Sequence, residues 1–385
     1  MPRPAAAMPA LVLLLLAAPV AAEPFLLVGL DNKLFFEAAG PRNGAPGTDS
    51  VAIVDLADPA HPRLTGTLPL PNSVAGPPTN LGITRDGRLG LVASSLLNQP
   101  KDQGFTAVPD DTLHVIDMAA RPPALIETIK VGRMPSGLAI NRAGTMALVA
   151  NRAGKSVSVL SIEGKAVRQV AEVAVDDEAA AVVITPDGRQ AFFAKNLVHK
   201  VGVLSIDGMT VTYDKKQDIP VGLGVYNLRV TPDGQRVLAA NTGVGGDGHA
   251  DTVSVIDAAA RPPRVLDHVT VGDGPEGFAV SPDGRHAVAV LLRGTAAVHS
   301  AWSYGTTGAV VLLSVEGGRV RVLNQVDAGN LPEGVAFSGD GRYAYVGNYV
   351  DRNLQVFRVD ATKIVDTGVK LELPGQPASV AAAVR

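Results

Sequence analysis

The stretch Gly274–Val290, GPEGFAVSPDGRHAVAV, predicts a chain break, a short strand, a tight turn and a second strand. We expect Pro275-Glu276-Gly277 to interrupt the chain and Phe278–Val280 to form the first strand. Pro282-Asp283-Gly284 is typical of a turn, with glycine where a positive φ is required. Ala287–Val290 is an apolar run of the kind found in strands that are buried on both faces.

The same pattern recurs along the chain. Its turn glycines are separated by 44 to 57 residues, and a β-type repeat of roughly 40 to 50 residues indicates a propeller built from four-stranded blades. The further copies are Asn80–Ser94, Gly137–Asn151, Ala181–Lys195, Asn227–Asn241 and Gly334–Asn348.

A second recurring pattern, such as DTVSVID from Asp251, marks the third strand of each unit and occurs seven times, against six copies of the first. The counts agree if the two chain ends share one blade, with FLLVGL near the N-terminus and Pro377–Val384 as its innermost strand. Such a closure leaves no open seam between unpaired sheet edges. We therefore predict an all-β, seven-bladed β-propeller with four-stranded antiparallel blades, closed by N- and C-terminal strands in one shared blade.

The blade sequence resembles the YVTN-type β-propeller repeat, which is named for a tetrapeptide in the second strand. That tetrapeptide appears as Tyr345-Val346-Gly347-Asn348 and, in degenerate form, as Leu148-Val149-Ala150-Asn151. The resemblance covers essentially all of Phe25–Val384. It implies relatives among lactonase-like propellers, surface-layer-type repeat proteins and propeller subunits of periplasmic quinone-dependent dehydrogenases. No catalytic set of that family can be matched here residue by residue.

The first 22 residues have the features of a secretory signal peptide. Arg3 is a small positive region, Leu11–Ala18 is apolar, and Val20-Ala21-Ala22 offers small residues for cleavage. An uncleaved membrane anchor is the alternative, because the apolar run is nearly long enough to span a bilayer. We predict a signal peptide over residues 1–22, a single propeller over 23–385, and a periplasmic or secreted location.

Composition excludes several classes of site. The sequence has no cysteine, which rules out disulfides, thiolate metal sites and cysteine nucleophiles. A formal charge of −3 does not favour nucleic acid as a partner. We expect a monomer that has no membrane span after signal removal, with a small ligand or a periplasmic protein as its partner.

The longest connections follow the second strand of four blades, at 31–50, 94–111, 241–251 and 291–308. All of these lie on the same face of a propeller, and insertions confined to one face indicate the binding face of a repeat protein. The rim of the channel on that face is predicted from the residue that precedes each innermost strand. This ring comprises Thr79, Ser136, Ala180, Tyr226, Glu276, Glu333 and Ala378.

Two neighbouring blades place Glu276 and Glu333 on this rim, where they are either solvated charges or a pair that shares a proton or binds a cation. With His299 they are the candidate catalytic residues. His249 with Asp247 and Asp251 is a weak candidate for a divalent cation site, and we predict no other cofactor. The candidate ligand-binding residues are Tyr226, Arg293, Trp302, Tyr304, Asn348 and Lys195.

No nucleophile elbow, phosphate loop, zinc helix, dinucleotide fingerprint or CxxCH motif is present. The favoured hypothesis is therefore an exported binding or scaffold propeller that acts through its loop-rich channel mouth. The alternatives are a lactonase-like hydrolase, in which a rim glutamate or histidine activates water, and an accessory subunit of a periplasmic redox enzyme.

Overall fold

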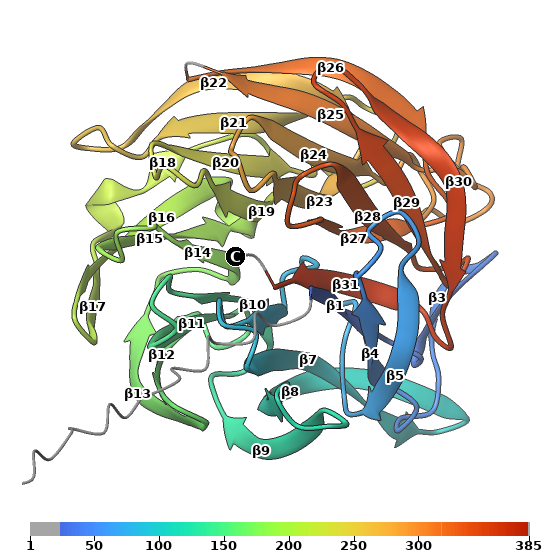
Figure 1. Cartoon of the computed structure of the whole chain (residues 1–385), viewed down its shortest axis with the longest axis horizontal. Helices are drawn as coiled ribbons and strands as arrows, with labels where there is room; N and C mark the ends of the chain where they lie inside the picture. The colour runs from blue at the N-terminus through green and yellow to red at the C-terminus, as the bar shows by residue number, and fades with distance from the viewer. Residues whose placement is uncertain (1–23, 317, 384–385) are drawn as a thin grey trace, which may run out of the picture.

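The computed structural model describes residues 24–316 and 318–383, and over these it forms a ring of seven sheets around a central axis (Figure 1). Each blade is named here after its innermost strand. The predicted signal peptide lies outside the described residues. No helix in the described ranges is long and apolar enough to cross a bilayer.

Four blades come from the first part of the ring. The shared β31 blade contains β31 (Pro377–Ala382), β1 (Phe25–Leu30), β4 (Ser50–Asp55) and β5 (Arg63–Pro69). The β6 blade contains β6 (Leu81–Ile83), β7 (Leu89–Lys101), β8 (Gly104–Asp117) and β9 (Ala124–Lys130). The β10 blade contains β10 (Pro135–Ile140), β11 (Met146–Asn151), β12 (Ser156–Glu163) and β13 (Ala166–Ala174). The β14 blade contains β14 (Ala179–Ile184), β15 (Gln190–Lys195), β16 (Lys200–Asp207) and β17 (Thr210–Tyr213), with β18 (Ile219–Pro220) also paired to β16.

Three blades complete the ring. The β19 blade contains β19 (Val225–Val230), β20 (Arg236–Asn241), β21 (Asp251–Asp257) and β22 (Arg264–Gly272). The β23 blade contains β23 (Pro275–Val280), β24 (His286–Leu291), β25 (Ala309–Glu316) and β26 (Arg319–Asp327). The β27 blade contains β27 (Pro332–Phe337), β28 (Tyr343–Asn348), β29 (Asn353–Val359) and β30 (Ile364–Glu372). Outside the blades are the hairpin of β2 (Leu34–Glu37) with β3 (Gly40–Asn43) and the 3-10 turns η1 (Asn196–Val198) and η2 (Lys215–Gln217).

The predicted closure is confirmed. Strand β31 pairs antiparallel with β1, with Val380 opposite Val28, and it also packs against β27 and β6 of the neighbouring blades. The first and last described strands thus meet in one sheet, and β31 lies next to the axis (Figure 1).

The repeated turn has the same local cause in five blades, where a Ser or Thr hydroxyl donates to the turn aspartate. In β23–β24, Gly284 has φ +72°, and the Ser281 hydroxyl donates to the Asp283 carboxylate at 2.6 Å. The same hydroxyl accepts from the His286 amide at 3.0 Å, which fixes the start of the next strand. The turn aspartates accept hydrogen bonds from residues of their own turns, as Asp283 does from Ser281. They therefore stabilise the turns and are not candidate ligand-binding groups.

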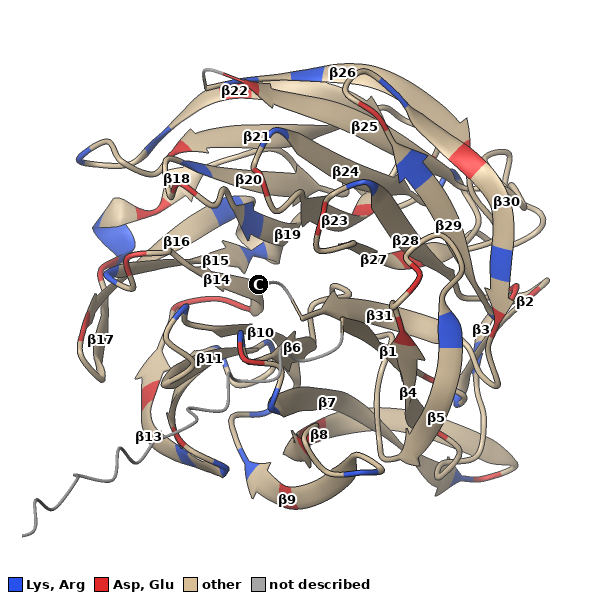
Figure 2. Ribbon diagram, viewed as in Figure 1, with Lys and Arg blue, Asp and Glu red and all other residues tan. Residues whose placement is uncertain are grey.

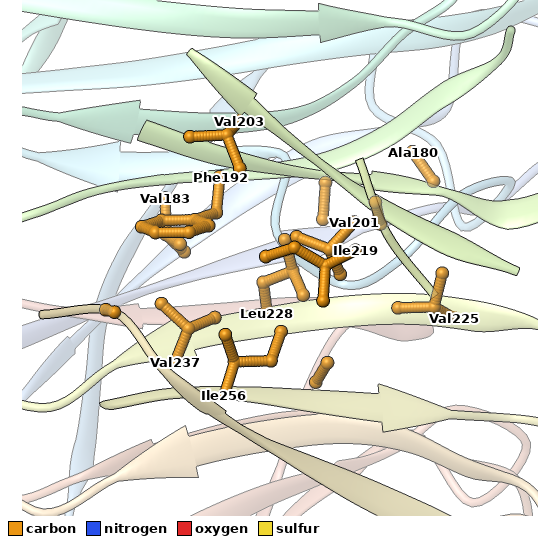
Figure 3. Packing of buried hydrophobic residues seen from close by; sticks show 14 residues of the cluster. Ala180, Val183, Phe192, Val201, Val203, Ile219, Val225, Leu228, Val237 and Ile256 are labelled. Carbon is orange, nitrogen blue, oxygen red and sulfur yellow. The ribbon is translucent and has the colours of Figure 1, made fainter. Parts of the chain in front are cut away.

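Apolar side chains between neighbouring blades form the core. Figure 3 shows one such contact, where Phe192 and Val183 of the β14 blade lie against Leu228 and Val237 of the β19 blade. All four side chains are buried, and each such burial stabilises the fold by about 1.5–3 kcal/mol. The small aliphatic side chains allow the twisted sheets to approach closely.

The prediction that Pro275-Glu276-Gly277 interrupts the chain is wrong. These residues begin strand β23, in which Pro275 pairs with Leu291 and Gly277 pairs with Val290, so Glu276 is an unpaired bulge residue. Similar irregularities occur at the start of five other innermost strands. A bulge bends the strand and redirects a side chain, so the rim residues are positioned by these irregularities and not by turns.

The four insertions lie on one face, as predicted. Hydrogen bonds link 94–111 to 31–50, 31–50 to 291–308, and 291–308 to 241–251. The Asn98 amide, on the long β7–β8 hairpin, donates to the carbonyls of Lys33 and Gly44. The His299 amide donates to the Ala38 carbonyl at 3.0 Å, and the Ser303 hydroxyl donates to the Gly246 carbonyl at 3.1 Å. Two insertions predicted as loops contain regular structure, since 94–111 extends β7 and β8 and 31–50 contains the β2–β3 hairpin.

Candidate functional site

The innermost strands carry very few charged residues. Over the seven strands that line the axis, all within the described ranges, only Glu276, Glu333 and Arg229 are acidic or basic. Figure 2 shows the same contrast, with most of the charge on outer strands and connections. The two glutamates lie at the beginnings of β23 and β27, on the loop-rich face, whereas Arg229 lies toward the other end of β19.

Glu276, which is half-buried, and Glu333, which is buried, form a pair of carboxyl groups on adjacent blades. Close packing brings the blades together here, because a Cβ on Gly277 would overlap the Glu333 carbonyl oxygen. Glu333 is only 4% exposed, and its Oε2 has no hydrogen-bond partner among the described residues. Burial raises the pKa of Glu333 well above its usual range, and the neighbouring Glu276 charge raises it further.

The pKa of Glu276 is also raised, to about 7, because burial outweighs the opposing effect of the Arg152 charge. Near neutral pH both the protonated and the ionised form of this carboxyl group are therefore populated. A group with that property is suited to donate or accept a proton, or to alternate between donor and acceptor in binding.

An aromatic and a cationic side chain complete this carboxyl site. The Arg152 guanidinium lies 5.8 Å from the centre of the Tyr226 ring, and its Nε is 3.5 Å from a carboxylate oxygen of Glu178. Burial raises the pKa of Tyr226, and the charges of Glu276 and Glu333 act in the same direction. Tyr226 therefore remains a neutral hydroxyl beside the carboxyl pair.

The inserted loops cover the mouth where this site lies. Tyr349 is completely buried, donates its hydroxyl to the Leu34 carbonyl at 2.8 Å, and meets the Phe36 ring edge to face at 5.7 Å. We call the apolar cluster around Tyr349 the cap. It contains Val74, Leu292, Leu331, Tyr349 and Ala378, with Leu34, Phe36, Ala296 and Val350 packed against them.

The cap includes part of the predicted rim, because Ala378 belongs to both. Of the predicted rim residues, only Tyr226 and Glu276 retain partial exposure. The remaining five are buried: Thr79, Ser136, Ala180, Glu333 and Ala378. The exposed surface of this rim therefore belongs to Tyr226 and Glu276, the two members that also take part in the carboxyl site.

The channel itself contains a cavity of about 540 Å³ whose lining extends to the opposite face, where Arg85 and Arg142 of the short turns border it. Arg229 lies in its wall, and one guanidinium nitrogen donates to the Asn227 side-chain oxygen at 2.9 Å and to the Leu228 carbonyl at 2.8 Å. The Asn227 amide in turn donates to the backbone carbonyl of Glu276 at 2.9 Å. A single buried asparagine thus connects the cavity wall with the backbone at the carboxyl site.

Two of the predicted ligand-binding residues are engaged within the fold. The buried Lys195 ammonium contacts Asp176 at 2.5 Å, Asp218 at 2.6 Å and the Tyr213 hydroxyl at 3.1 Å, which occupies its three donors. The Asn348 amide donates to Asn353 and Gln355. Lys195 and Asn348 are the last residues of the second strands of their blades, and both side chains bind residues of neighbouring segments.

Of the other predicted residues, Tyr226 belongs to the carboxyl site, and the insertion at 291–308 carries Arg293, His299, Trp302 and Tyr304. Arg293 pairs with Asp327 at 2.7 Å, and the exposed His299 ring lies 4.1 Å from the Tyr304 ring. Trp302 is 79% exposed. Among the described residues, no histidine is a neighbour that shifts the pKa of Glu276 or Glu333.

The candidate cation ligands lie on the neighbouring insertion. The His249 ring is exposed and lies 6.3 Å from the Trp302 ring, while Asp247 accepts from the His249 amide at 3.0 Å. Asp251 accepts from the Gly274 amide at 2.9 Å. Within the described ranges, no three His, Cys, Asp or Glu side chains are arranged so that they could hold a metal ion.

Sequence reasoning missed Arg152 and Arg229. Arg152 directly follows Asn151, at the end of a second strand, and its approach to Tyr226 depends on how the blades are arranged. Arg229 gives a clearer signal, because the equivalent positions in the other blades hold only glycine, alanine or valine: Gly82, Ala139, Val183, Ala279, Ala336 and Ala381.

No protein-family model matches this sequence, and no curated protein matches it either. The fold is similar to several solved structures. A putative 6-phosphogluconolactonase from Bacteroides uniformis has a TM-score of 0.68 at 16% identity, covering 94% of this chain and 99% of that one. The periplasmic gluconolactonase of Pseudomonas aeruginosa has a TM-score of 0.66 at 20% identity, with the same coverage of both chains. The hydrazine synthase of Kuenenia stuttgartiensis has a TM-score of 0.60 at 19% identity, covering 80% of this chain and 90% of that one. At these identities the likeness establishes the propeller fold.

Proposed function

We propose that this protein is an exported binding propeller that holds a small polar ligand at the carboxyl site under the cap. The observation that carries the proposal is the convergence of Glu276 and Glu333, one with an unpartnered buried oxygen, beside Tyr226 and Arg152. Burying two carboxyl groups side by side costs stability unless a ligand uses them. A shared proton gives the pair both a donor and acceptors, which suits a hydroxylated ligand.

Binding is tested by a thermal-shift panel of sugars, polyols and sugar lactones. We expect at least one of these ligands to raise the melting temperature of the wild-type protein, because a ligand bound only by the folded state stabilises it. The combined Glu276→Gln and Glu333→Gln variant should lose that shift. Glu127→Gln, on an exposed outer strand, is the matched control and should retain it. A shift that survives in the double variant contradicts the proposal.

A hydrolase that acts on cyclic esters is the second candidate, and the pKa of Glu276 near 7 favours it. In that reaction Glu276 would take a proton from water as the water attacks the ester carbonyl, and Tyr226 or protonated Glu333 would donate a hydrogen bond to the developing oxyanion. When the intermediate collapses, the ring C–O bond of the ester would break and protonated Glu276 would return the proton to the leaving ring oxygen, giving the open-chain hydroxy acid. Two similar folds belong to proteins described as a putative 6-phosphogluconolactonase and a periplasmic gluconolactonase. The YVTN-type resemblance points in the same direction.

Glucono-δ-lactone is the probe for this candidate, with acid release followed in a pH-stat. We expect turnover above the spontaneous rate to fall at least a hundredfold in Glu276→Gln, since a general base typically contributes 10²–10⁴-fold. Ligand stabilisation without turnover would leave the binding function and exclude this lactone as a substrate. Export is tested separately by the mature N-terminus, which we expect at Glu23 after secretion.

A further inference from the structure

The channel cavity has an unusual distribution of charge. Its wall is largely apolar, formed by residues such as Ile83, Ile140 and Phe337. It includes three arginines and no acidic residue among the described positions. Arg85 and Arg142 are exposed at the turn face, where they border the cavity. The aspartates of the nearby turns do not line the cavity, because they bind their own turn residues, as Asp233 binds Thr231.

Arg229 is the one charge deep in this wall. Its Nη1 donates to two neutral acceptors on the same strand, the Asn227 side chain and the Leu228 carbonyl. No acidic residue pairs with the guanidinium among the described residues. Burial lowers the pKa of Arg229 to about 10, with no compensating carboxylate. Arg229 is half-buried, and its Nε and Nη2 have no hydrogen-bond partner among the described residues. These two donors are therefore available to an anionic group that enters the cavity.

The position of Arg229 in the blade repeat also favours a ligand-binding role. The six equivalent residues of the other blades are glycine, alanine or valine, and a small residue there would avoid the desolvation cost. Asn227, which is fully buried, fixes one edge of the guanidinium, leaving Nε and Nη2 for an incoming group. A planar guanidinium binds carboxylate or phosphate through two parallel hydrogen bonds.

We infer that the channel cavity binds a small organic anion whose carboxylate or phosphate group pairs with Arg229 and whose aliphatic body packs on the channel wall. The ligand enters from the turn face, where Arg85 and Arg142 attract it. A cavity of about 540 Å³ is within the usual range for small-molecule sites. This anion site is distinct from the carboxyl site and does not depend on the function proposed for it.

Isothermal titration calorimetry with hexanoate, hexyl phosphate and neutral hexanamide tests this inference. We expect one of the two anions to bind the wild-type protein with 1:1 stoichiometry and hexanamide to bind at least tenfold more weakly. Preference between hexanoate and hexyl phosphate assigns the anionic group. The Arg229→Met variant should bind the anion at least tenfold more weakly, whereas Arg229→Lys, which retains the charge without the planar fork, should be intermediate.

Circular dichroism melting controls for folding, because Arg229→Met removes the hydrogen-bond partner of the buried Asn227 side-chain oxygen. Binding is measured well below the melting temperatures of both proteins, so that only folded protein is titrated. The combined Glu276→Gln and Glu333→Gln variant should bind the anion as the wild type does, which separates this site from the carboxyl site. Equal affinity in Arg229→Met, equal affinity for hexanamide, or no binding of either anion would overturn the inference.

Discussion

At the scale of single residues, the carboxyl site is governed by burial rather than by ion pairing. Lys195 and its two aspartates show the ordinary solution, in which every buried charge has a partner. Glu276 and Glu333 do not follow it, because Arg152, the cation that acts on Glu276, also approaches Glu178. A raised carboxyl pKa is the consequence, and it makes the stability of the protein depend on pH.

Whether stability rises or falls with pH depends on which state, native or unfolded, binds more protons. Between pH 4.5 and about 7 the native state holds protons on these carboxyl groups that the unfolded chain has released, so stability falls as pH rises. We expect the Glu276→Gln variant to match the wild type at pH 5 and to exceed its free energy of unfolding by about 1–3 kcal/mol at pH 8.5. Urea denaturation at both pH values measures this difference. Glu127→Gln is the control, and parallel profiles for Glu276→Gln and the wild type would exclude a raised pKa.

At the scale of strands and turns, the recurring sequence was sufficient for the blades but not for the rim. The Asp-Gly turns and the closing strand β31 depend on local chemistry and on a count of repeats, and both predictions are confirmed. Pro-Glu-Gly has the composition of a turn, yet in β23 it continues the strand because Gly277 pairs with Val290 across a bulge. Whether these residues form a turn or a strand depends on packing against the neighbouring blade, and local sequence does not reveal that packing.

The cap illustrates the same limit. Its apolar residues lie in segments far apart in the sequence, such as Phe36 and Leu292, and no periodic pattern marks them. The one-faced location of the insertions was predictable from their place in the repeat, but their packing over the channel mouth was not. For the same reason Arg152 and Tyr226, from separate blades, could not be paired in advance.

The cap should be the first part of the molecule to loosen when its aromatic contact is removed. Phe36→Ala deletes the edge-to-face contact with Tyr349, and we expect faster amide exchange in β2 and β3 while the blade strands remain protected. Hydrogen exchange with mass spectrometry measures this difference. Phe35→Ala is the control, because the Phe35 ring contacts Arg42 of the same hairpin and is not part of the cap. Equal exchange in the two variants would mean that the cap does not hold the hairpin.

At the scale of the whole molecule, the ring depends on the pairing of β31 with β1. Val380 is buried at this junction, opposite Val28 and against Ala336 and Tyr345 of the neighbouring blade. Since every other blade is continuous in sequence, this is the one seam among the described strands at which the ring can open without breaking a hairpin.

We therefore expect Val380→Asp to destabilise the entire ring. Burying an unpaired carboxylate there should cost several kcal/mol, enough to separate β31 from β1 and expose two sheet edges. Circular dichroism melting and size-exclusion chromatography should then show a large fall in melting temperature together with association of molecules. Lys370→Asp, on the exposed outermost strand β30, introduces the same side chain without burial and should leave both measurements near the wild-type values. If Val380→Asp melts like Lys370→Asp, the ends of the chain do not close the ring, because a buried charge at a closed seam could not be tolerated.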